Sequence, residues 1–367
     1  MTSTTRVNVS DGRPVDDLGR TIRRRHTIFW LSGLSLGLVL TIVLAVGVGA
    51  VSVPPSTVSR ILGHHLLGAP AEMDWTLAQD SIIWQVRLPR VLLGAVVGAA
   101  LAVCGVALQA MVRNMLADPY LLGVTSGAST GAAGAILFGF AAGLGENALS
   151  ASAFLGALGA SVVVFLVARA GGRITSLRLL LAGVAVGYAL YAATGFLIFA
   201  SGSAEGSRSV LFWLLGSLGL ARWGLPLALV LVIVCLTVAM LIVWGRRLDA
   251  LSVGDETAHA LGISPTGFRV RLLVVVSLCV GGVVAASGGI GFVGLVIPHV
   301  ARRFVGAAHS RAVPVAALLG AVFLVWADVV ARVLLEPREL PIGIITALVG
   351  APFLLLLVRR FQAAGSG

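Results

Sequence analysis

Residues 248–263 read LDALSVGDETAHALGI, a polar stretch between two apolar runs that are each long enough to cross a bilayer. Arg246 and Arg247 precede it, and Arg269 and Arg271 follow it. Within the stretch, apolar residues alternate with charged and small ones, as in short amphipathic helices. It is too polar for the lipid interior and too regularly patterned for a slack linker. It therefore predicts a small helical platform that lies outside the membrane and is presented to another protein.

The composition predicts that the platform belongs to a polytopic membrane protein. Of the 367 residues, 58% are hydrophobic and 11% are charged, and the mean hydropathy is +1.03. Soluble domains are about 45–50% apolar and about 25% charged. All 26 basic residues are arginine. Without lysine the chain has no P-loop, whose lysine contacts the nucleotide phosphates, so any ATP hydrolysis would belong to another chain.

The apolar runs predict ten membrane spans, since one span needs about 20 apolar residues. They cover residues 28–50, 82–112, 120–142, 148–169, 176–200, 224–245, 270–288, 290–305, 312–333 and 341–359. The second is long enough to be tilted or kinked near Pro89. The seventh and eighth, which meet at Ser287-Gly288-Gly289, share too little length for two full crossings. A further apolar piece, Val210–Leu220, is predicted as a re-entrant or interfacial helix on the outer side.

The distribution of arginines predicts the orientation of these spans. With ten spans both termini lie on one side, and that side carries 19 arginines against seven on the other. The positive-inside rule places the termini and the platform in the cytoplasm. We expect a disordered basic tail at residues 1–27, a transmembrane domain at 28–360 and a second cytoplasmic tail at 361–367. The seven outer arginines are not explained by orientation.

Small residues in the spans predict a tightly packed bundle. Glycine and alanine dominate stretches such as residues 94–100, GAVVGAA, and small residues let helix backbones approach closely in lipid. Cys104, Cys235 and Cys279 lie within apolar segments and are interpreted as small buried hydrophobic residues. The adjacent pair His64-His65 does not converge on one ligand, so no metal site is predicted there.

Seven short motifs then occur in order along the chain. They are RLPR at 87–90, GAALA at 98–102, RNMLADP at 113–119, GDETAHALG at 254–262, GFVGLVIPH at 291–299, ADVVAR at 327–332 and ELPIG at 339–343. In this combination the chain resembles the FecCD family of ABC-transporter permeases, which import iron-siderophores, haem and vitamin B12. The resemblance covers about residues 30–360. Met115 departs from the family, which usually has proline there, and is expected to loosen the turn after the second span.

The resemblance implies a fold and a set of partners. The fold would be the all-α type II ABC importer permease fold, with ten transmembrane helices in the bacterial cytoplasmic membrane. Two permease subunits, identical or different, would surround a central pathway. Two cytoplasmic ABC ATPase subunits would dock below them, and an extracytoplasmic substrate-binding protein would dock above. The fifth span, the Val210–Leu220 helix, the eighth span and the tenth span would line the pathway.

By the same resemblance, residues 248–263 are the coupling helices that sit in a cleft of the ATPase. A short helix pair on a rigid bundle can transmit rigid-body movement, and a solvated loop is the simpler alternative. The residues predicted to take part are Leu251, Gly254, Asp255, Glu256, His259, Leu261 and Gly262.

Three of the outer arginines, Arg87, Arg90 and Arg332, match family positions that meet glutamates of the binding protein. Guanidinium–carboxylate pairs are bidentate and orienting, and such exposed pairs set register and association rate more than affinity. The alternative is that these side chains snorkel to lipid headgroups. Asp328, four residues before Arg332, is interpreted as its i,i+4 partner.

The resulting functional prediction is the permease of an ATP-driven importer for an iron chelate, with haem or cobalamin as further candidate substrates. An ion-coupled secondary transporter is the alternative, and Asp328 is almost the only residue that would serve it. A membrane-embedded enzyme is disfavoured because no metalloprotease or serine-hydrolase motif occurs. No catalytic, cofactor-binding or metal-ligating residue is predicted.

Overall fold

The computed structural model describes residues 20–49, 51–70, 72–170, 172 and 174–365, and these residues form helices and turns without a strand. Eight of the described helices are long and apolar enough to span a membrane. The long segments are α1 (Arg20–Gly47), α4 (Leu88–Val112), α6 (Ala148–Arg169), α7 (Ser176–Ser201), α9 (Leu225–Val243), α12 (Pro265–Ser287), α14 (His309–Val333) and α15 (Ile342–Gly365). The shorter ones are α2 (Pro55–Leu67), α3 (Leu77–Ser81), α5 (Val124–Phe138), α8 (Ala204–Leu214), α10 (Gly245–Val253), α11 (Asp255–Ala260) and α13 (Val293–Val305).

Each of the ten predicted spans corresponds to one helical segment. The second combines α3, a π-helical turn at Ile82–Arg87 and α4, so its irregularity lies just before Pro89. The eighth is the short helix α13, which follows the non-helical break after Ser287. Both irregularities were predicted at these places, because proline and paired glycines interrupt helical hydrogen bonding.

Several helices differ in their bounds from the predicted segments. Helix α1 begins at Arg20 and α15 continues to Gly365, so helical structure extends into both predicted tails, 1–27 and 361–367. The division of the chain into tails and a transmembrane domain stays a prediction. Residues 1–19 and 366–367 lie outside the described residues. The predicted helix at Val210–Leu220 is α8, which begins at Ala204 and ends at Leu214. Helix α2 was not predicted, because its two histidines and its short apolar face resemble a loop.

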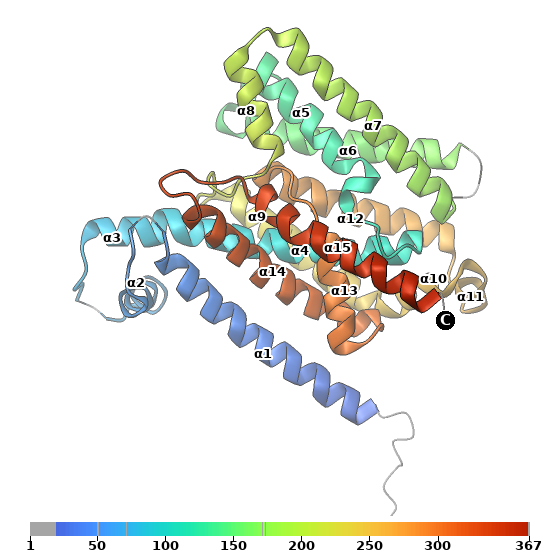
Figure 1. The fold of residues 1–367 in the computed structure, drawn as a ribbon, viewed down its shortest axis with the longest axis horizontal. Helices are drawn as coiled ribbons and strands as arrows, with labels where there is room; N and C mark the ends of the chain where they lie inside the picture. Colours follow the sequence, from blue (N-terminus) through green and yellow to red (C-terminus); the bar gives the residue numbers. More distant parts are fainter. Residues whose placement is uncertain (1–19, 50, 71, 171, 173, 366–367) are drawn as a thin grey trace, which may run out of the picture.

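The helices form two groups, visible in Figure 1. Helices α5, α6, α7 and α8 pack together in the upper part, and α4, α14, α13 and α1 pack together below them. Helix α12 joins the groups by packing on both α6 and α4. The platform helices α10 and α11 lie at one end of the bundle, and α2 and α3 lie at the opposite end (Figure 1).

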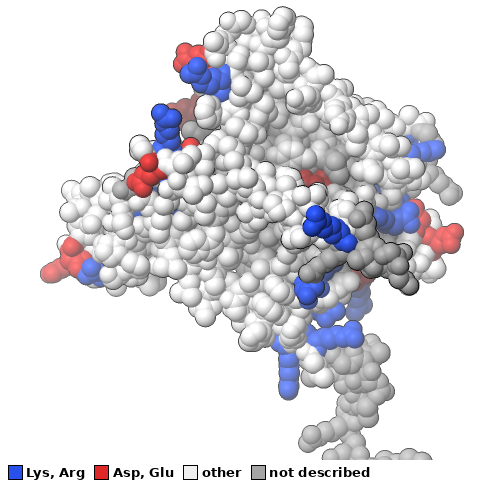
Figure 2. All heavy atoms as spheres, in the orientation of Figure 1, with Lys and Arg blue, Asp and Glu red and all other residues white. Residues whose placement is uncertain are grey.

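Charged side chains are distributed unevenly between these two ends of the bundle. Arginine side chains gather at the end that carries α10, α11 and the start of α1, while the flanks between the two ends are largely uncharged (Figure 2). This is the pattern expected of a helical bundle that crosses a bilayer, because lipid tolerates few unpaired charges.

Glycines bring the central helices into backbone contact, as predicted from the sequence. A Cβ atom added to Gly98 would lie 2.1 Å from the carbonyl oxygen of Gly320, which joins α4 to α14. A Cβ atom on Gly105 would lie 2.0 Å from the carbonyl oxygen of Gly294, which joins α4 to α13. Any side chain at either position would force these helices apart.

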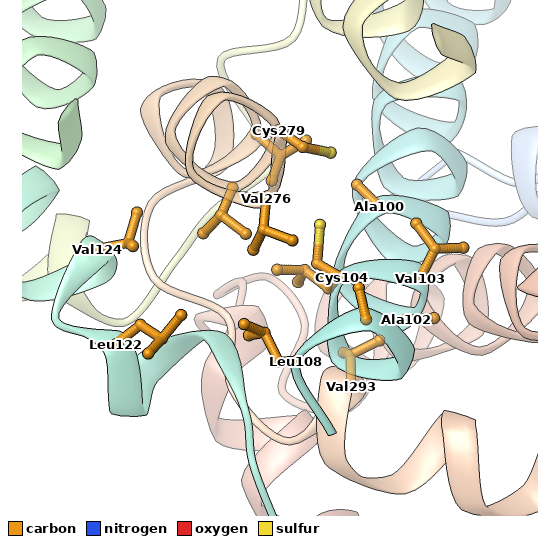
Figure 3. Close-up of a cluster of buried hydrophobic side chains, with 14 of the residues drawn as sticks. Ala100, Ala102, Val103, Cys104, Leu108, Leu122, Val124, Val276, Cys279 and Val293 are labelled. Atoms are coloured by element: carbon orange, nitrogen blue, oxygen red, sulfur yellow. The ribbon is translucent and has the colours of Figure 1, made fainter. Parts of the chain in front are cut away.

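The centre of the bundle contains two of the three cysteines. Cys104 of α4 and Cys279 of α12 are fully buried and face each other among Leu108, Val276 and neighbouring apolar side chains (Figure 3). All three cysteines are free thiols, and Cys235 of α9 is exposed. The interpretation as buried hydrophobic residues is therefore confirmed for two of the cysteines and wrong for Cys235.

Candidate functional site

The platform consists of two short helices that rest on the bundle through apolar side chains. Leu248 and Leu251 of α10 and Ala258 of α11 are fully buried. Leu248 and Leu251 are three residues apart, so they lie on the same face of α10 and make that face apolar. A Cβ atom on Gly245 would lie 2.7 Å from the backbone nitrogen of Ser310, so α10 starts in close contact with the start of α14.

Asp249 fastens α10 to α14. Its Oδ1 accepts hydrogen bonds from the backbone N–H of His309, at 2.9 Å, and from ring Nδ1 of the same residue, at 2.6 Å. His309 is the first residue of α14, where backbone N–H groups lack helical partners and a carboxylate is favourable. Burial acts to raise the pKa of Asp249, but the hydrogen bonds from His309 outweigh it and lower the pKa.

Asp255 fastens α11 to α12. Arg269 Nη2 donates to Oδ1 at 2.6 Å, and Nη1 donates to Oδ2 at 2.9 Å, which makes a bidentate pair. Arg113 lies at the edge of the pair, with Nη2 3.8 Å from Oδ1. The hydrogen bonds from Arg269 lower the pKa of Asp255 below its usual value and outweigh partial burial, which acts in the opposite direction.

The seven residues predicted to couple to an ATPase divide into two sets. Leu251 and Asp255 face the bundle, and Gly254 joins the two helices. Glu256, His259, Leu261 and Gly262 are exposed, and the side chain of Leu261 is 65% exposed. An exposed leucine between charged residues is a feature of protein contact surfaces. Their participation in ATPase contact stays a prediction, now confined by geometry to the second set.

Two of the three outer arginines hold the end of α1. Arg87 and Arg332 are 8% and 7% exposed, and both donate to main-chain carbonyl groups in and just after the last turn of α1. The accepting oxygens belong to Ala45, Val46, Gly47, Val48 and Val51, at distances from 2.6 to 3.1 Å. The last carbonyls of a helix lack intrahelical partners and attract cations. These contacts explain why arginine stands at both positions.

Arg90 makes a different set of contacts. Its Nε and Nη2 each lie 3.0 Å from Oδ1 of Asp328, and its Nη1 donates to both carboxylate oxygens of Glu339, at 2.8 and 3.0 Å. Glu339 keeps 52% of its side chain exposed. Asp328 also lies 3.0 Å from Nε of Arg332, which confirms the predicted i,i+4 ion pair, although this contact lacks hydrogen-bond geometry. Asp328 therefore links α14 to α4.

A cavity of about 420 Å³ opens between α8, α13 and α15. It is mainly apolar, and its lining includes Leu214, Phe292, Ala347, Asp118 and Tyr120. Three of the four predicted pathway walls contribute to it, whereas α7 does not. Asp118 caps the short helix at Pro119–Leu122 by accepting the backbone N–H of Tyr120 at 3.0 Å, and burial raises its pKa to about 6.

Arg269, His309 and Glu339 were missed by sequence reasoning. Arg269 was interpreted only as a flanking charge, because it directly precedes the predicted span 270–288, whereas in the structure it is the fifth residue of α12. Glu339 lies in a family motif, but its partner Arg90 is 249 residues away in sequence. Such long-range pairs leave no periodic signal in one chain.

A bundle of apolar helices with a polar helical platform at its arginine-rich end has the architecture of a membrane transport subunit that another protein drives. Comparison with known proteins agrees. The FecCD transport family matches residues 37–360. The cobalamin import system permease of Halobacterium salinarum is 42% identical over 79% of this chain and 77% of its own length. The hemin transport system permease of Yersinia pestis is 40% identical over 80% of this chain and 89% of its own length.

A solved structure described as an inward-facing metal-chelate type ABC transporter superposes with a TM-score of 0.77 at 36% identity, covering 90% of this chain and 98% of that one. The chain belongs to the FecCD transport family. It is a multi-pass membrane permease of the ABC importer type, a transport component whose ATPase is a separate subunit. The ion-coupled alternative built on Asp328 is set aside, since that carboxylate is paired with two arginines.

Proposed function

We propose that this chain carries an iron chelate, such as a ferric siderophore, across the bacterial cytoplasmic membrane, with haem and cobalamin as the alternative substrates. The observation that supports this most is the match to the FecCD family over residues 37–360. Relatives at about 40% identity are described as hemin and cobalamin permeases, which supports a large chelate as the substrate, while a relative in Haemophilus influenzae that is 36% identical is described as a molybdate permease. The cavity of about 420 Å³ between α8, α13 and α15 is part of the substrate path.

The platform faces the ATPase in this proposal, and both chain termini lie in the cytoplasm. Glu256, His259 and Leu261 form the exposed side of α11 and of the turn after it, where a partner of complementary shape reaches them. Two ATPase subunits and a second permease subunit, either a copy of this chain or a related one, complete the membrane complex.

At the opposite end, a substrate-binding protein docks through carboxylates. Of the three predicted docking arginines, Arg90 is the best placed, since its guanidinium meets the exposed carboxylate of Glu339 at the surface. Arg87 and Arg332 support docking indirectly, by fixing the end of α1 beside Arg90. R90Q should weaken docking and leave ATPase assembly intact. Charge reversal at Arg87 would instead set a carboxylate against the carbonyl oxygens that end α1 and destabilise the bundle itself.

The test is ATP-driven uptake by proteoliposomes that contain this chain with its ATPase and binding protein. We expect uptake of at least one member of a panel of ferric hydroxamate siderophore, haemin and cobalamin, with molybdate as a small-anion control. L261D should abolish co-purification of the ATPase, whereas L67D, which changes an exposed leucine at the opposite end, should not. Uptake driven by an ion gradient without ATP would overturn the proposal.

A further inference from the structure

Arg269 occupies an unusual position at the junction between the platform and the bundle. Its side chain is 1% exposed, so the guanidinium is withdrawn from water almost completely. A buried guanidinium is tolerated only when its donors are satisfied, because an unpaired buried charge is strongly unfavourable. Arg269 lies in the first turns of α12, directly behind the platform.

All five N–H donors of Arg269 have acceptors. Two go to the carboxylate of Asp255, at 2.6 and 2.9 Å. The remaining three reach the carbonyl oxygen of Met111 at 3.3 Å, the carbonyl oxygen of Ile174 at 3.2 Å and the hydroxyl oxygen of Ser176 at 2.9 Å. A guanidinium carries five N–H donors in a fixed plane, so every donor of Arg269 is used.

These acceptors belong to different elements. Met111 is in the last turn of α4, Ile174 lies in the connection from α6 to α7, and Ser176 is the first residue of α7. Asp255 is the first residue of α11. The Ser176 hydroxyl in turn donates to the Met111 carbonyl at 3.1 Å and closes the network. One side chain on α12 therefore joins the platform to both helix groups of the bundle.

We propose that Arg269 is the positioning residue that makes α11 move as one body with the ends of α4, α7 and α12. This rests on the proposed coupling role of the platform and extends it from contact to transmission. A bidentate ion pair fixes the orientation of α11 as well as its distance. A movement that the ATPase imposes on α11 then reaches α4 and α7 directly, without passing along the connection that precedes α12.

Distance measurement tests this without knowledge of the substrate. Spin labels are placed at Thr257 of α11 and Leu177 of α7, two exposed positions, in a chain whose three cysteines are replaced by alanine. The complex with its ATPase is compared nucleotide-free and trapped with ATP and vanadate. We expect the intramolecular distance to stay constant in the otherwise native chain and to differ between the two states in R269K. A distance that changes in the native chain, or stays constant in R269K, overturns the proposal.

Transport measurement gives the second readout. Lysine at position 269 keeps the charge but offers only three donors from one point, so it cannot reach all five acceptor atoms, which belong to four residues. Coupling between sites corresponds to factors of about 5–150, and we expect uptake per ATP hydrolysed to fall at least about fivefold in R269K, with ATPase co-purification unchanged. If R269K folds poorly, D255N tests the same ion pair by changing its other member, whose side chain is 34% exposed.

R271K is the matched control, because it makes the same change at an exposed arginine on the same helix, two residues away. It should leave both ATPase co-purification and the yield of uptake per ATP unchanged. Native transport with unchanged coupling in both R269K and D255N would refute the role of Arg269 while leaving the proposed function intact. Absence of ATP-driven uptake by the native chain would instead refute the proposed function.

Discussion

Several charged side chains of this protein join elements that are distant in sequence through ion pairs and hydrogen bonds. Asp255 and Asp249 hold the platform, Arg87 and Arg332 hold the end of α1, and Asp328 holds α4 against α14. Of these contacts, only the pair of Asp328 with Arg332 could be predicted from the sequence, because residues four apart share a helix face. The remaining contacts join residues of different elements, so they depend on which helix ends meet in the fold. A single sequence carries no periodic pattern that predicts this.

Asp118 is expected to reduce stability at neutral pH. Burial raises its pKa in the folded protein to about 6, above the unfolded value of about 3.9. The unfolded chain therefore releases its proton first, and stability falls as pH rises from about 4 to about 6. A shift of this size corresponds to about 3 kcal/mol as an order of magnitude.

D118N keeps an oxygen that can accept the N–H of Tyr120 and removes the buried charge. We expect its unfolding temperature to exceed that of the native chain at pH 8, with the difference disappearing near pH 4. Thermal unfolding of the purified protein, followed by size-exclusion chromatography after heating, measures this. An equal difference at both pH values would show that the charge of Asp118 is not responsible.

At the scale of elements, the sequence predicted the long helices well because a span must be about 20 apolar residues long. Helix ends were less predictable. The arginine-rich start of α1 is too polar for lipid, yet it is helical in the structure. A helix can extend beyond its apolar segment into water, so the end of the apolar segment does not mark the end of the helix. The platform was predicted as a pair of short helices, but the point at which they divide, Gly254, became visible only in the structure.

Glycine contacts between helices make a second prediction. G105A places a methyl group 2.0 Å from the backbone oxygen of Gly294, so α4 and α13 must separate. Overpacking of this kind costs about 1–3 kcal/mol, and more where backbone atoms must move. We expect G105A to lower the unfolding temperature in detergent, whereas G33A on α1, where no atom lies within 4 Å of the added carbon, leaves it unchanged or raises it.

The element-scale prediction can be contradicted in a simple way. Equal unfolding temperatures for G105A and G33A would mean that α4 and α13 adjust without loss, and the backbone contact would then contribute little to the bundle.

At the scale of the whole molecule, the two ends of the bundle are built for different partners. The platform end presents an exposed leucine, Leu261, beside the exposed side chains of Glu256 and His259. The other end presents Arg90 with a carboxylate already in place, Glu339. Family resemblance predicted both ends as docking surfaces, but it assigned three arginines to one of them, and the structure uses two of these internally.

E339Q is expected to tighten the docking of the binding protein. Glu339 accepts two hydrogen bonds from Arg90, so it competes with any carboxylate that a partner brings. Exposed ion pairs contribute about 0.2–1 kcal/mol, which corresponds to a factor of about 1.5–5 in Kd. Surface plasmon resonance with immobilised binding protein measures this, and the gain should shrink at high salt.

E336Q serves as the control for that measurement, since it removes the same charge from the same exposed loop without a described contact to Arg90. An equal gain in affinity for the binding protein in both variants would mean that the change in net charge, and not the contact with Arg90, is responsible. Weaker docking in E339Q would mean that Glu339 itself supports the partner.

The placement of the three cysteines offers a way to count subunits in the assembled complex. Cys104 and Cys279 are sealed in the core, and Cys235 alone is exposed. Cys235 lies midway along the membrane-spanning helix α9, where a water-soluble maleimide dye does not reach it, so S59C on the exposed surface of α2 should supply the one labelled thiol per chain. Photobleaching of single labelled complexes would then show two steps when both permease subunits are copies of this chain. It would show one step when the other permease subunit and the ATPases contribute no accessible thiol.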